Sequence, residues 1–261
     1  MTVDYRFGTV GFGYKEWLGN FYPPGMKSRD YLGHYSQFFD TVEIDSTFYG
    51  TPKLESVQRW AQQTPPDFVF CPKTPRVISH DQRLQNFPSM DEFLTVMRHL
   101  REKLGPILIQ LPPDFTTAEQ GILADFLAQL PTDLRFAVEF RHRSWDEPGT
   151  GELLQKYGVC FAAADYIHLP ATIQRTTDFL YIRFLGIHGR FRGKDSEQID
   201  VMDRLHHWYS EIQPHLPHIN TVYGFFNNDF SGHSPATCNR FKQLFDLPFA
   251  YPEIPTQTRL L

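Results

Sequence analysis

The sequence predicts an α/β fold in which a single domain, residues 1–261, forms a (β/α)8 TIM-type barrel. Short runs of β-branched or aromatic residues alternate with amphipathic stretches, and the 261 residues contain eight such runs. No low-complexity tract, charge run or flexible linker divides the chain. A doubly wound open sheet is the alternative, but it requires a glycine fingerprint after the first strand, and Gly8-Thr9-Val10-Gly11-Phe12-Gly13 lacks the required spacing.

Eight strands are expected where apolar runs are bounded by turn residues. They are predicted at Arg6–Phe12, Thr41–Phe48, Phe68–Lys73, Ile107–Leu111, Arg135–Arg141, Val159–Asp165, Leu180–Leu185 and Thr221–Asn227. Helix start signals follow most of these strands. The predicted helices begin near Ser28, Thr51-Pro52, Ser89 with Glu92, Thr117 with Gln120, Ile199, and Ser234-Pro235. The connection between strands six and seven shows no helical face.

Composition limits the classes of function. Lysine and arginine number 25 against 30 aspartates and glutamates, and this balance argues against a strongly electrostatic nucleic-acid binder. Cys71, Cys160 and Cys238 are far apart and never form a C-x-x-C pair, which disfavours a disulfide framework and a cysteine-based zinc site. No apolar run approaches the ~18 residues of a membrane span. We therefore expect a cytoplasmic protein with no membrane partner.

Polar side chains recur at the carboxyl ends of the predicted strands, in the register that faces the barrel axis. This inward set is Glu43, Asp45, Lys73, Gln110, Glu139, Arg141, Asp165 and Arg183, and at least one amide of Asn227 and Asn228 is expected to face the barrel mouth. His142 directly follows strand five, where a surface role and a functional role are both open. Charges on apolar strands are costly to bury unless they are paired. One interpretation is a buried ion-pair network that fixes strand register. Their position at strand ends favours the other interpretation, a polar pocket at the barrel mouth.

The pocket interpretation predicts roles for these residues. We predict catalytic roles for Glu139, Asp165 and Lys73, with either carboxylate as general acid or base. A carboxylate beside two cations normally has a depressed pKa, which suits a base. The predicted binding residues are Glu43, Asp45, Gln110, Arg141, His142, Arg183, Asn227 and Asn228. The three cations Lys73, Arg141 and Arg183 are expected to hold a phosphate or carboxylate group of a small ligand.

Several motifs together resemble those of the YecE-like family, domain of unknown function 72. The quoted segments are Gly8–Trp17 with Asn20-Phe21-Tyr22-Pro23, Thr41–Tyr49, Pro72-Lys73 through Ile78-Ser79-His80, Gln110–Pro113, Val138–His142 with Trp145, and Phe226–Asp229. They run through the chain in order. The resemblance implies a TIM-type barrel that is distantly similar to sugar isomerases and endonuclease-IV-like barrels, and it implies no particular activity.

The chain departs from the family pattern at four positions. Gly13 replaces a usual serine, Asp45 a usual asparagine, Arg143 a frequent proline and Leu185 a common histidine. A mechanism that requires that serine hydroxyl or that histidine is therefore not expected here. The other members of the inward charged set agree with the family pattern.

Three functions remain open at this point. The first is an enzyme that uses acid/base carboxylates on a small anionic substrate. The second is a metal-dependent hydrolase of phosphodiesters, with Glu43, Asp45, Glu139 and Asp165 as conceivable hard-ion ligands. Three nearby cations would repel a metal, so we predict no metal-ligand set and identify no cofactor. The third is a barrel that binds a ligand or a partner without catalysis. Nucleic acid is a less favoured partner, and the oligomeric state is not predicted.

Overall fold

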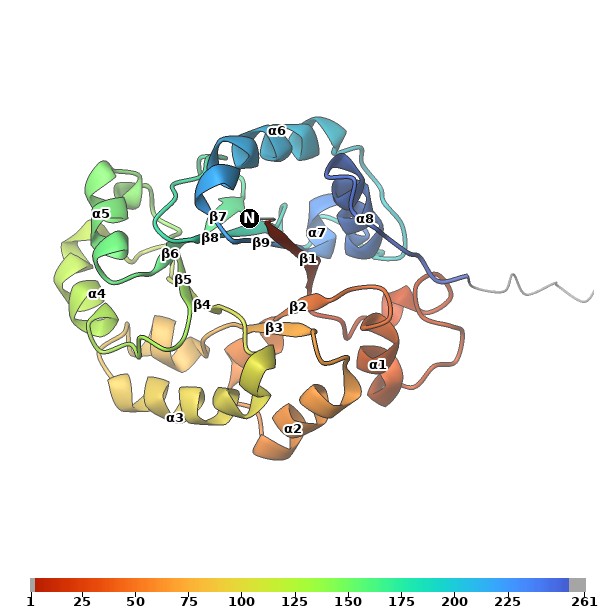
Figure 1. Cartoon of the computed structure of the whole chain (residues 1–261), viewed down its shortest axis with the longest axis horizontal. Coiled ribbons are helices and arrows are strands. Elements are labelled where there is room, and N and C mark those ends of the chain that lie inside the picture. Colours follow the sequence, from red (N-terminus) through yellow and green to blue (C-terminus); the bar gives the residue numbers. More distant parts are fainter. Residues whose placement is uncertain (1–2, 254–261) are drawn as a thin grey trace, which may run out of the picture.

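Parallel β-strands surround the centre of the molecule, and helices pack outside them (Figure 1). The structure is a computed structural model that describes residues 3–253. The strands form a six-stranded sheet in the order β3-β2-β1-β9-β8-β7 and a three-stranded sheet in the order β4-β5-β6. The strand bounds are β1 (Asp4–Val10), β2 (Thr41–Ile44), β3 (Val69–Pro72), β4 (Ile107–Gln110), β5 (Phe136–Glu139), β6 (Cys160–Phe161), β7 (Ala163–Asp165), β8 (Phe179–Phe184) and β9 (Thr221–Phe226).

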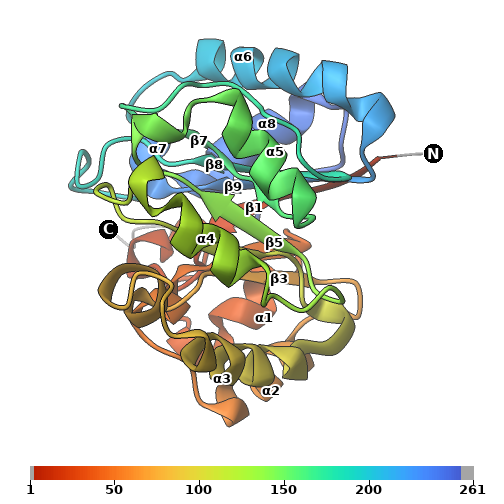
Figure 2. The same cartoon turned by 90° about the vertical axis from the view of Figure 1, so that its left-hand side faces the viewer.

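The α-helices lie mainly between consecutive strands. Their bounds are α1 (Tyr31–Tyr35), α2 (Leu54–Gln63), α3 (Phe87–Met97), α4 (Gln120–Leu127), α5 (Pro148–Lys156), α6 (Met202–Ile212), α7 (Asn228–Ser231) and α8 (Ser234–Leu244). Figure 2 shows α2 and α3 on one side of the strands and α6 on the opposite side. No helix in residues 3–253 is long and apolar enough to cross a lipid bilayer.

Two helices, α5 and α7, were not predicted from the sequence. Helix α5 contains Gly149 and Gly151, which lower intrinsic helix propensity, and α7 is only four residues long. Two predicted caps were also displaced. The capping box before α4 joins Thr116 to Glu119, one residue earlier than expected, and α3 begins at Phe87 rather than near Ser89. Boundaries of this kind depend on tertiary packing as well as on local residue type.

The predicted closed barrel is not confirmed, because the hydrogen-bonded ladders form two sheets rather than one. The predicted strand Val159–Asp165 is divided at Ala162, so that β6 pairs with β5 and β7 pairs with β8. Between β3 and β4 the pairing is reduced to two isolated bridges, Phe70 with Leu104 and Lys73 with Leu108. Pro72 and Pro106 lie at this seam, and neither can donate a backbone N–H to a ladder.

Alternation along the strands produces an inner core that has residues from both sheets. The inner residues are Val10, Cys71, Leu108, Ala137, Cys160, Ala162, Phe179, Tyr181, Tyr223 and Phe225, and all are buried. A polar side chain follows two positions later on several of these strands, as Lys73 follows Cys71 and Arg183 follows Tyr181. The apolar inner core therefore ends in a charged layer at the carboxyl ends of the strands.

Candidate functional site

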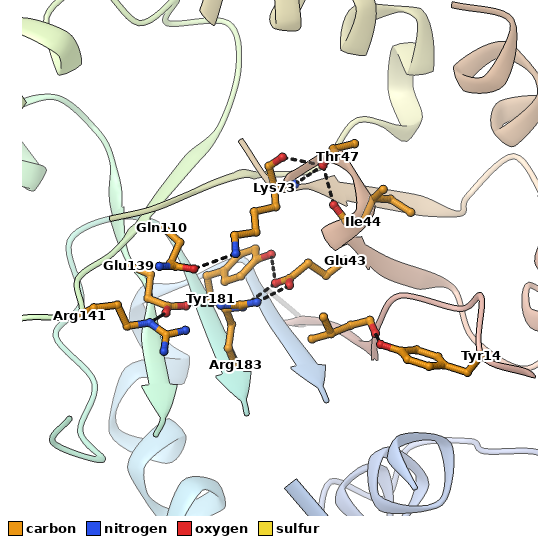
Figure 3. A network of polar contacts seen from close by, with 11 residues as sticks. Tyr14, Glu43, Ile44, Thr47, Lys73, Gln110, Glu139, Arg141, Tyr181 and Arg183 are labelled. Carbon is orange, nitrogen blue, oxygen red and sulfur yellow. Dashed lines mark hydrogen bonds and ion pairs between the residues drawn. The ribbon is translucent and has the colours of Figure 1, made fainter. Parts of the chain in front are cut away.

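A buried ion-pair network joins three strands in this charged layer (Figure 3). Arg183 on β8 donates from Nη2 to Glu43 Oε1 at 2.7 Å and from Nε to Glu43 Oε2 at 2.9 Å. Its Nη1 donates to Glu139 Oε2 at 2.6 Å. The Tyr181 hydroxyl donates a further bond of 2.8 Å to Glu43 Oε2. Both carboxylates are fully buried, and Arg183 thus connects β2 to β5 across the two sheets.

The network fixes the charge state of its members. Burial raises the pKa of the Glu139 carboxyl, but Arg141 and Arg183 lower it more, and the pKa falls to about 2. Burial alone would lower the pKa of Arg183, and the two glutamates raise it above its ordinary value. Breaking one partner of such a network leaves an uncompensated buried charge. A buried ion-pair network was one of the two interpretations of the inward charges. Glu43, Glu139 and Arg183 form such a network.

Arg141 presents a partly free guanidinium beside this network. Its Nε donates to Glu139, and its Cζ lies 4.4 Å from the centroid of the Tyr166 ring. Among residues 3–253, no carboxylate, carbonyl or hydroxyl accepts a hydrogen bond from its Nη1 or Nη2. The side chain is 13% exposed. Glu139 and Tyr166 thus hold the planar fork in place and leave its two terminal nitrogens available to an anion.

Lys73 is a buried cation with a neutral polar partner. Its Nζ donates to Gln110 Oε1 at 2.8 Å and lies 3.9 Å from the centroid of the Phe48 ring. The Thr47 hydroxyl fixes the backbone, because it donates to Lys73 O at 2.6 Å and accepts from Lys73 N at 3.1 Å. Burial, followed by the charge of Arg183, lowers the pKa of the Lys73 ammonium to about 8.

A cavity of about 340 Å³ opens above the network. Its lining includes Asp45, Phe48, Tyr49, Lys73, Arg141, Tyr166, Arg183, His188, Asn227 and Asp229. Burial and the charge of Glu43 raise the pKa of the Asp45 carboxyl, against the opposing effect of Arg183 and Lys73. Gly11, with φ of +73°, leaves space for this carboxylate, since a Cβ there would lie 3.0 Å from Asp45 Oδ1. The cavity therefore combines three cations with a carboxyl group that binds protons more readily than usual.

Two other hollows, of about 500 and 470 Å³, lie away from this charged layer. The first is lined by residues of α2 and of the segment around Arg101. The second lies beside α5 and the segment after β7, with a largely apolar lining. Neither contains a member of the inward polar set, and nor do two further hollows of about 450 and 240 Å³, so the charged cavity is the candidate site. Within residues 3–253, no three histidine, cysteine, aspartate or glutamate side chains are grouped to hold a metal ion.

Six predicted site residues do not line the cavity. Glu43, Glu139 and Gln110 bond to the cations of the charged layer, whereas Asp165, His142 and Asn228 have partners elsewhere. Asp165 points to α6, where it accepts from Arg204 Nε at 3.1 Å and from Trp208 Nε1 at 2.8 Å. Its expected inward register was wrong, because it alternates in step with Phe161 and Ala163, which pack against the outer core. His142 accepts from the backbone N–H of Ser144 at 3.1 Å and so caps the short helix that follows.

Of the two asparagines at the end of β9, one lines the cavity. Asn227 does so, and its Oδ1 accepts from the Asp229 backbone N–H at 2.9 Å, which caps α7. Asn228 is fully buried, and its Oδ1 accepts from Trp17 Nε1 and from the backbone and hydroxyl of Ser234. Asn228 therefore ties α7 to α8 and to Trp17, and it does not line the cavity.

Some cavity residues were not selected from the sequence. Phe48 lies against Lys73 and Tyr166 against Arg141, and Asp229 and His188 also line the cavity. Asp229 belongs to the segment Asn227-Asn228-Asp229, in which the sequence predicts only the two amides as site residues. Phe48 was expected to end the strand Thr41–Phe48, but β2 ends at Ile44 and Phe48 lies in the short helix Asp45–Tyr49, so strand alternation does not apply to it. Tyr166 follows β7, in a connection where no alternation indicates which way a side chain points.

Comparisons with known proteins place the chain in a family. It matches "Protein of unknown function DUF72" over residues 6–259. The UPF0759 protein YecE of Escherichia coli (strain K12) is 39% identical over 129 residues, which are 49% of this chain and 47% of YecE, so this match spans about half of that relative. The UPF0759 protein YunF of Bacillus subtilis (strain 168) is 26% identical over 275 residues, 93% of this chain and 95% of YunF.

Solved structures share the fold. A crystal structure of the DUF72 family protein TM1631 of Thermotoga maritima MSB8 superposes with a TM-score of 0.77 at 28% identity, and covers 93% of this chain and 99% of that chain. One of EF0366 of Enterococcus faecalis V583 has a TM-score of 0.72 at 18% identity, and covers 94% and 99%. The family resemblance drawn from the sequence motifs is thus confirmed. The chain belongs to the DUF72 family of proteins, which is described as of unknown function.

Proposed function

We propose that the charged cavity binds a small molecule through a carboxylate or phosphate group and carries out acid/base chemistry on it. The available fork of Arg141 is the observation that carries this proposal. A guanidinium held on one side by Glu139 and stacked on Tyr166 is already oriented, so that little side-chain freedom is lost when an anion binds. Lys73 lines the same cavity and adds a second positive charge.

We assign the acid or base role to Asp45 rather than to Glu139, which the sequence predicted for it. Glu139 is sealed beneath Arg141 and Arg183, and a carboxyl with a pKa of about 2 is a weak proton acceptor at neutral pH. Asp45 lines the cavity and has a raised pKa, which brings a carboxyl closer to the pH at which both proton uptake and release are rapid. Asp165, which pairs with Arg204, has no part in the proposed chemistry.

The closed form of the fold is also a proposal. We infer that β6 and β7 are two parts of one strand and that both sheets form a single-domain eight-strand barrel. Three features support this arrangement. Lys73 and Leu108 bridge β3 to β4, the Thr74 N–H donates to Leu108 O at 2.8 Å, and the inner core combines residues of both sheets. The candidate site would then lie at the carboxyl end of the barrel, where TIM-barrel enzymes have their active sites.

Binding without turnover is the second candidate function. Most of the charge in the layer is neutralised internally, because Arg183 donates to both Glu43 and Glu139. Such a layer can act as a rigid receptor for an anion without taking part in a reaction. Binding measurements alone do not separate the two candidates, whereas Asp45→Asn does. An enzyme would lose turnover and keep its affinity for the anion, while a receptor has no turnover to lose.

Titration calorimetry with inorganic phosphate and with malonate tests the anion site. We expect Arg141→Gln to weaken binding by about 10- to 100-fold, the equivalent of one hydrogen bond to a charged group. Arg204→Gln is the matched control. Like Arg141, Arg204 pairs with a carboxylate, that of Asp165, and lies over an aromatic ring, 4.0 Å from the centroid of Phe230, yet it lines no part of the cavity. Equal losses in both variants, or no binding by the unaltered protein, would contradict the proposal.

A further inference from the structure

The surroundings of Lys73 are unusual for a buried lysine. Among residues 3–253, no carboxylate lies within 4.0 Å of its Nζ, and its single side-chain hydrogen bond goes to the neutral amide of Gln110. The glutamates of the layer are instead engaged with the arginines. The charged and titratable groups around Lys73 are Glu43, Asp45, His80, Glu139, Arg141 and Arg183.

These surroundings favour the neutral amine. Burial removes the water that stabilises an ammonium, and the positive charge of Arg183 opposes a second one nearby. The resulting pKa of about 8 leaves roughly a tenth of Lys73 unprotonated at pH 7, far more than for an ordinary lysine. A neutral lysine amine that faces a ligand cavity is a nucleophile toward carbonyl carbon.

We propose that Lys73 forms an imine with the carbonyl group of an anionic oxo compound bound in the cavity. This inference rests on the proposed function, since Arg141 would hold the carboxylate or phosphate of that compound. It goes further by naming the substrate class, oxo acids and phosphorylated aldehydes or ketones, and by naming the bond that forms. The lining supplies a nucleophile, an anion-binding fork and a carboxyl group in one cavity.

The step is balanced without an oxidant or a reductant. The Lys73 nitrogen pair forms a bond to the carbonyl carbon while the carbonyl π pair moves onto oxygen. The two protons of the amine end on that oxygen, which leaves as water when the C=N bond forms. Asp45 is the proposed group that delivers a proton to the departing oxygen and accepts one from nitrogen. Carbon and nitrogen keep their oxidation states throughout.

Borohydride trapping followed by intact-mass and peptide mass spectrometry tests the imine. The full-length protein is incubated separately with pyruvate, glyoxylate and glycolaldehyde phosphate, and then reduced. Hydride adds to the imine carbon, so the trapped protein gains the mass of the probe less one oxygen atom. We expect one adduct per chain, located on the peptide that contains Lys73. The first two probes report a carboxylate-bearing substrate, and the third reports a phosphate-bearing one.

Lys73→Arg should abolish trapping, because it keeps the charge and loses the nucleophile. Lys103→Arg is the matched control. Lys103 is also partly buried, but its Nζ donates to Ala61 O, Thr64 O and Thr64 Oγ1, and it lines no part of the charged cavity. That variant should trap as the unaltered protein does. Circular dichroism of Lys73→Arg checks that the loss is not caused by unfolding.

Two negative results have different meanings. If calorimetry shows Arg141-dependent binding of phosphate or malonate and none of the three probes labels Lys73, the imine is overturned and the anion site stands. If neither anion binds, the proposed function fails and the imine fails with it. Labelling that persists in Lys73→Arg, or that is spread over surface lysines, would also overturn the assignment.

Discussion

Arg183 on β8 and Glu43 on β2 form a two-pronged ion pair between residues 140 positions apart in the sequence. Both side chains are almost completely buried, with 4% and 0% exposure. The planar fork of the guanidinium meets both carboxylate oxygens, and its remaining nitrogen reaches Glu139. This pair links β2 directly to β8, which are not neighbours in the sheet, beside the cavity that Arg141 and Lys73 line.

Removal of the Glu43 charge should strongly destabilise the fold. In Glu43→Gln, Arg183 stays charged and buried but loses the negative charge of one of its two carboxylate partners. We therefore expect a loss of about 3–5 kcal/mol in the free energy of unfolding. Urea denaturation followed by tryptophan fluorescence measures it. Asp133→Asn is the control, since Asp133 pairs with Arg98 on the surface and that pair contributes little. A loss as small as that of the control would show that the network does not stabilise the fold.

The network also predicts how stability depends on acid. The pKa of Glu139 falls from 4.5 to about 2 on folding, so the unfolded chain takes up this proton at higher pH than the folded protein does. The stabilisation is complete above about pH 4.5 and is lost progressively as the pH falls toward 2. In Glu139→Gln, we expect the free energy of unfolding to change less with pH between about 4.5 and 2. Urea denaturation at several pH values measures this dependence. An unchanged slope would contradict the assigned charge state.

Lys73 should make imine trapping depend on pH. The neutral fraction of an amine falls roughly tenfold for each pH unit below its pKa. With a pKa of about 8, the initial rate of labelling should rise about 50-fold between pH 6 and pH 8 and then level off. A rate that continues to rise up to pH 10 would indicate an ordinary solvent-exposed lysine. Glyoxylate, followed by borohydride at each pH, is a suitable probe.

Asp165 should affect stability without affecting ligand binding. Its carboxylate holds Arg204 and Trp208 on α6, so Asp165→Asn removes charged hydrogen bonds between β7 and that helix. We expect a loss of about 1–3 kcal/mol in unfolding free energy, together with unchanged affinity for phosphate. Calorimetry and urea denaturation of the same preparation measure both quantities. Weaker phosphate binding by Asp165→Asn would show that Asp165 contributes to the anion site and would contradict this prediction.

Much of the site could be predicted from two-residue alternation along the strands. On β5, the alternation of Ala137 with Phe136 and Val138 placed Glu139 on the inner side, and the same pattern on β8 placed Arg183 there. It failed at Asp165, which was expected inward by the same alternation but lies in step with Phe161 and Ala163, on the side that packs against the helices. Cys160 and Ala162 show the correct parity, since both belong to the inner core.

The sequence could not predict which charged residues pair with one another and which face the cavity. Which cations a glutamate neutralises depends on distances between strands that are remote in the sequence, as Glu43 and Arg183 are. Glu139 was therefore assigned a catalytic role, although it lies beneath Arg141. The sheet interruption at Pro72 and Pro106 was visible in the sequence, but its consequence depends on how the two strands meet.

A crystal structure of the protein soaked in phosphate or malonate tests the central claim most directly. The account predicts one anion in the charged cavity, within hydrogen-bond distance of Arg141 Nη1 or Nη2 and near Lys73 Nζ, while Glu139 stays paired with both arginines. An anion bound elsewhere on the surface, with this cavity filled by water alone at saturating anion concentration, would contradict it.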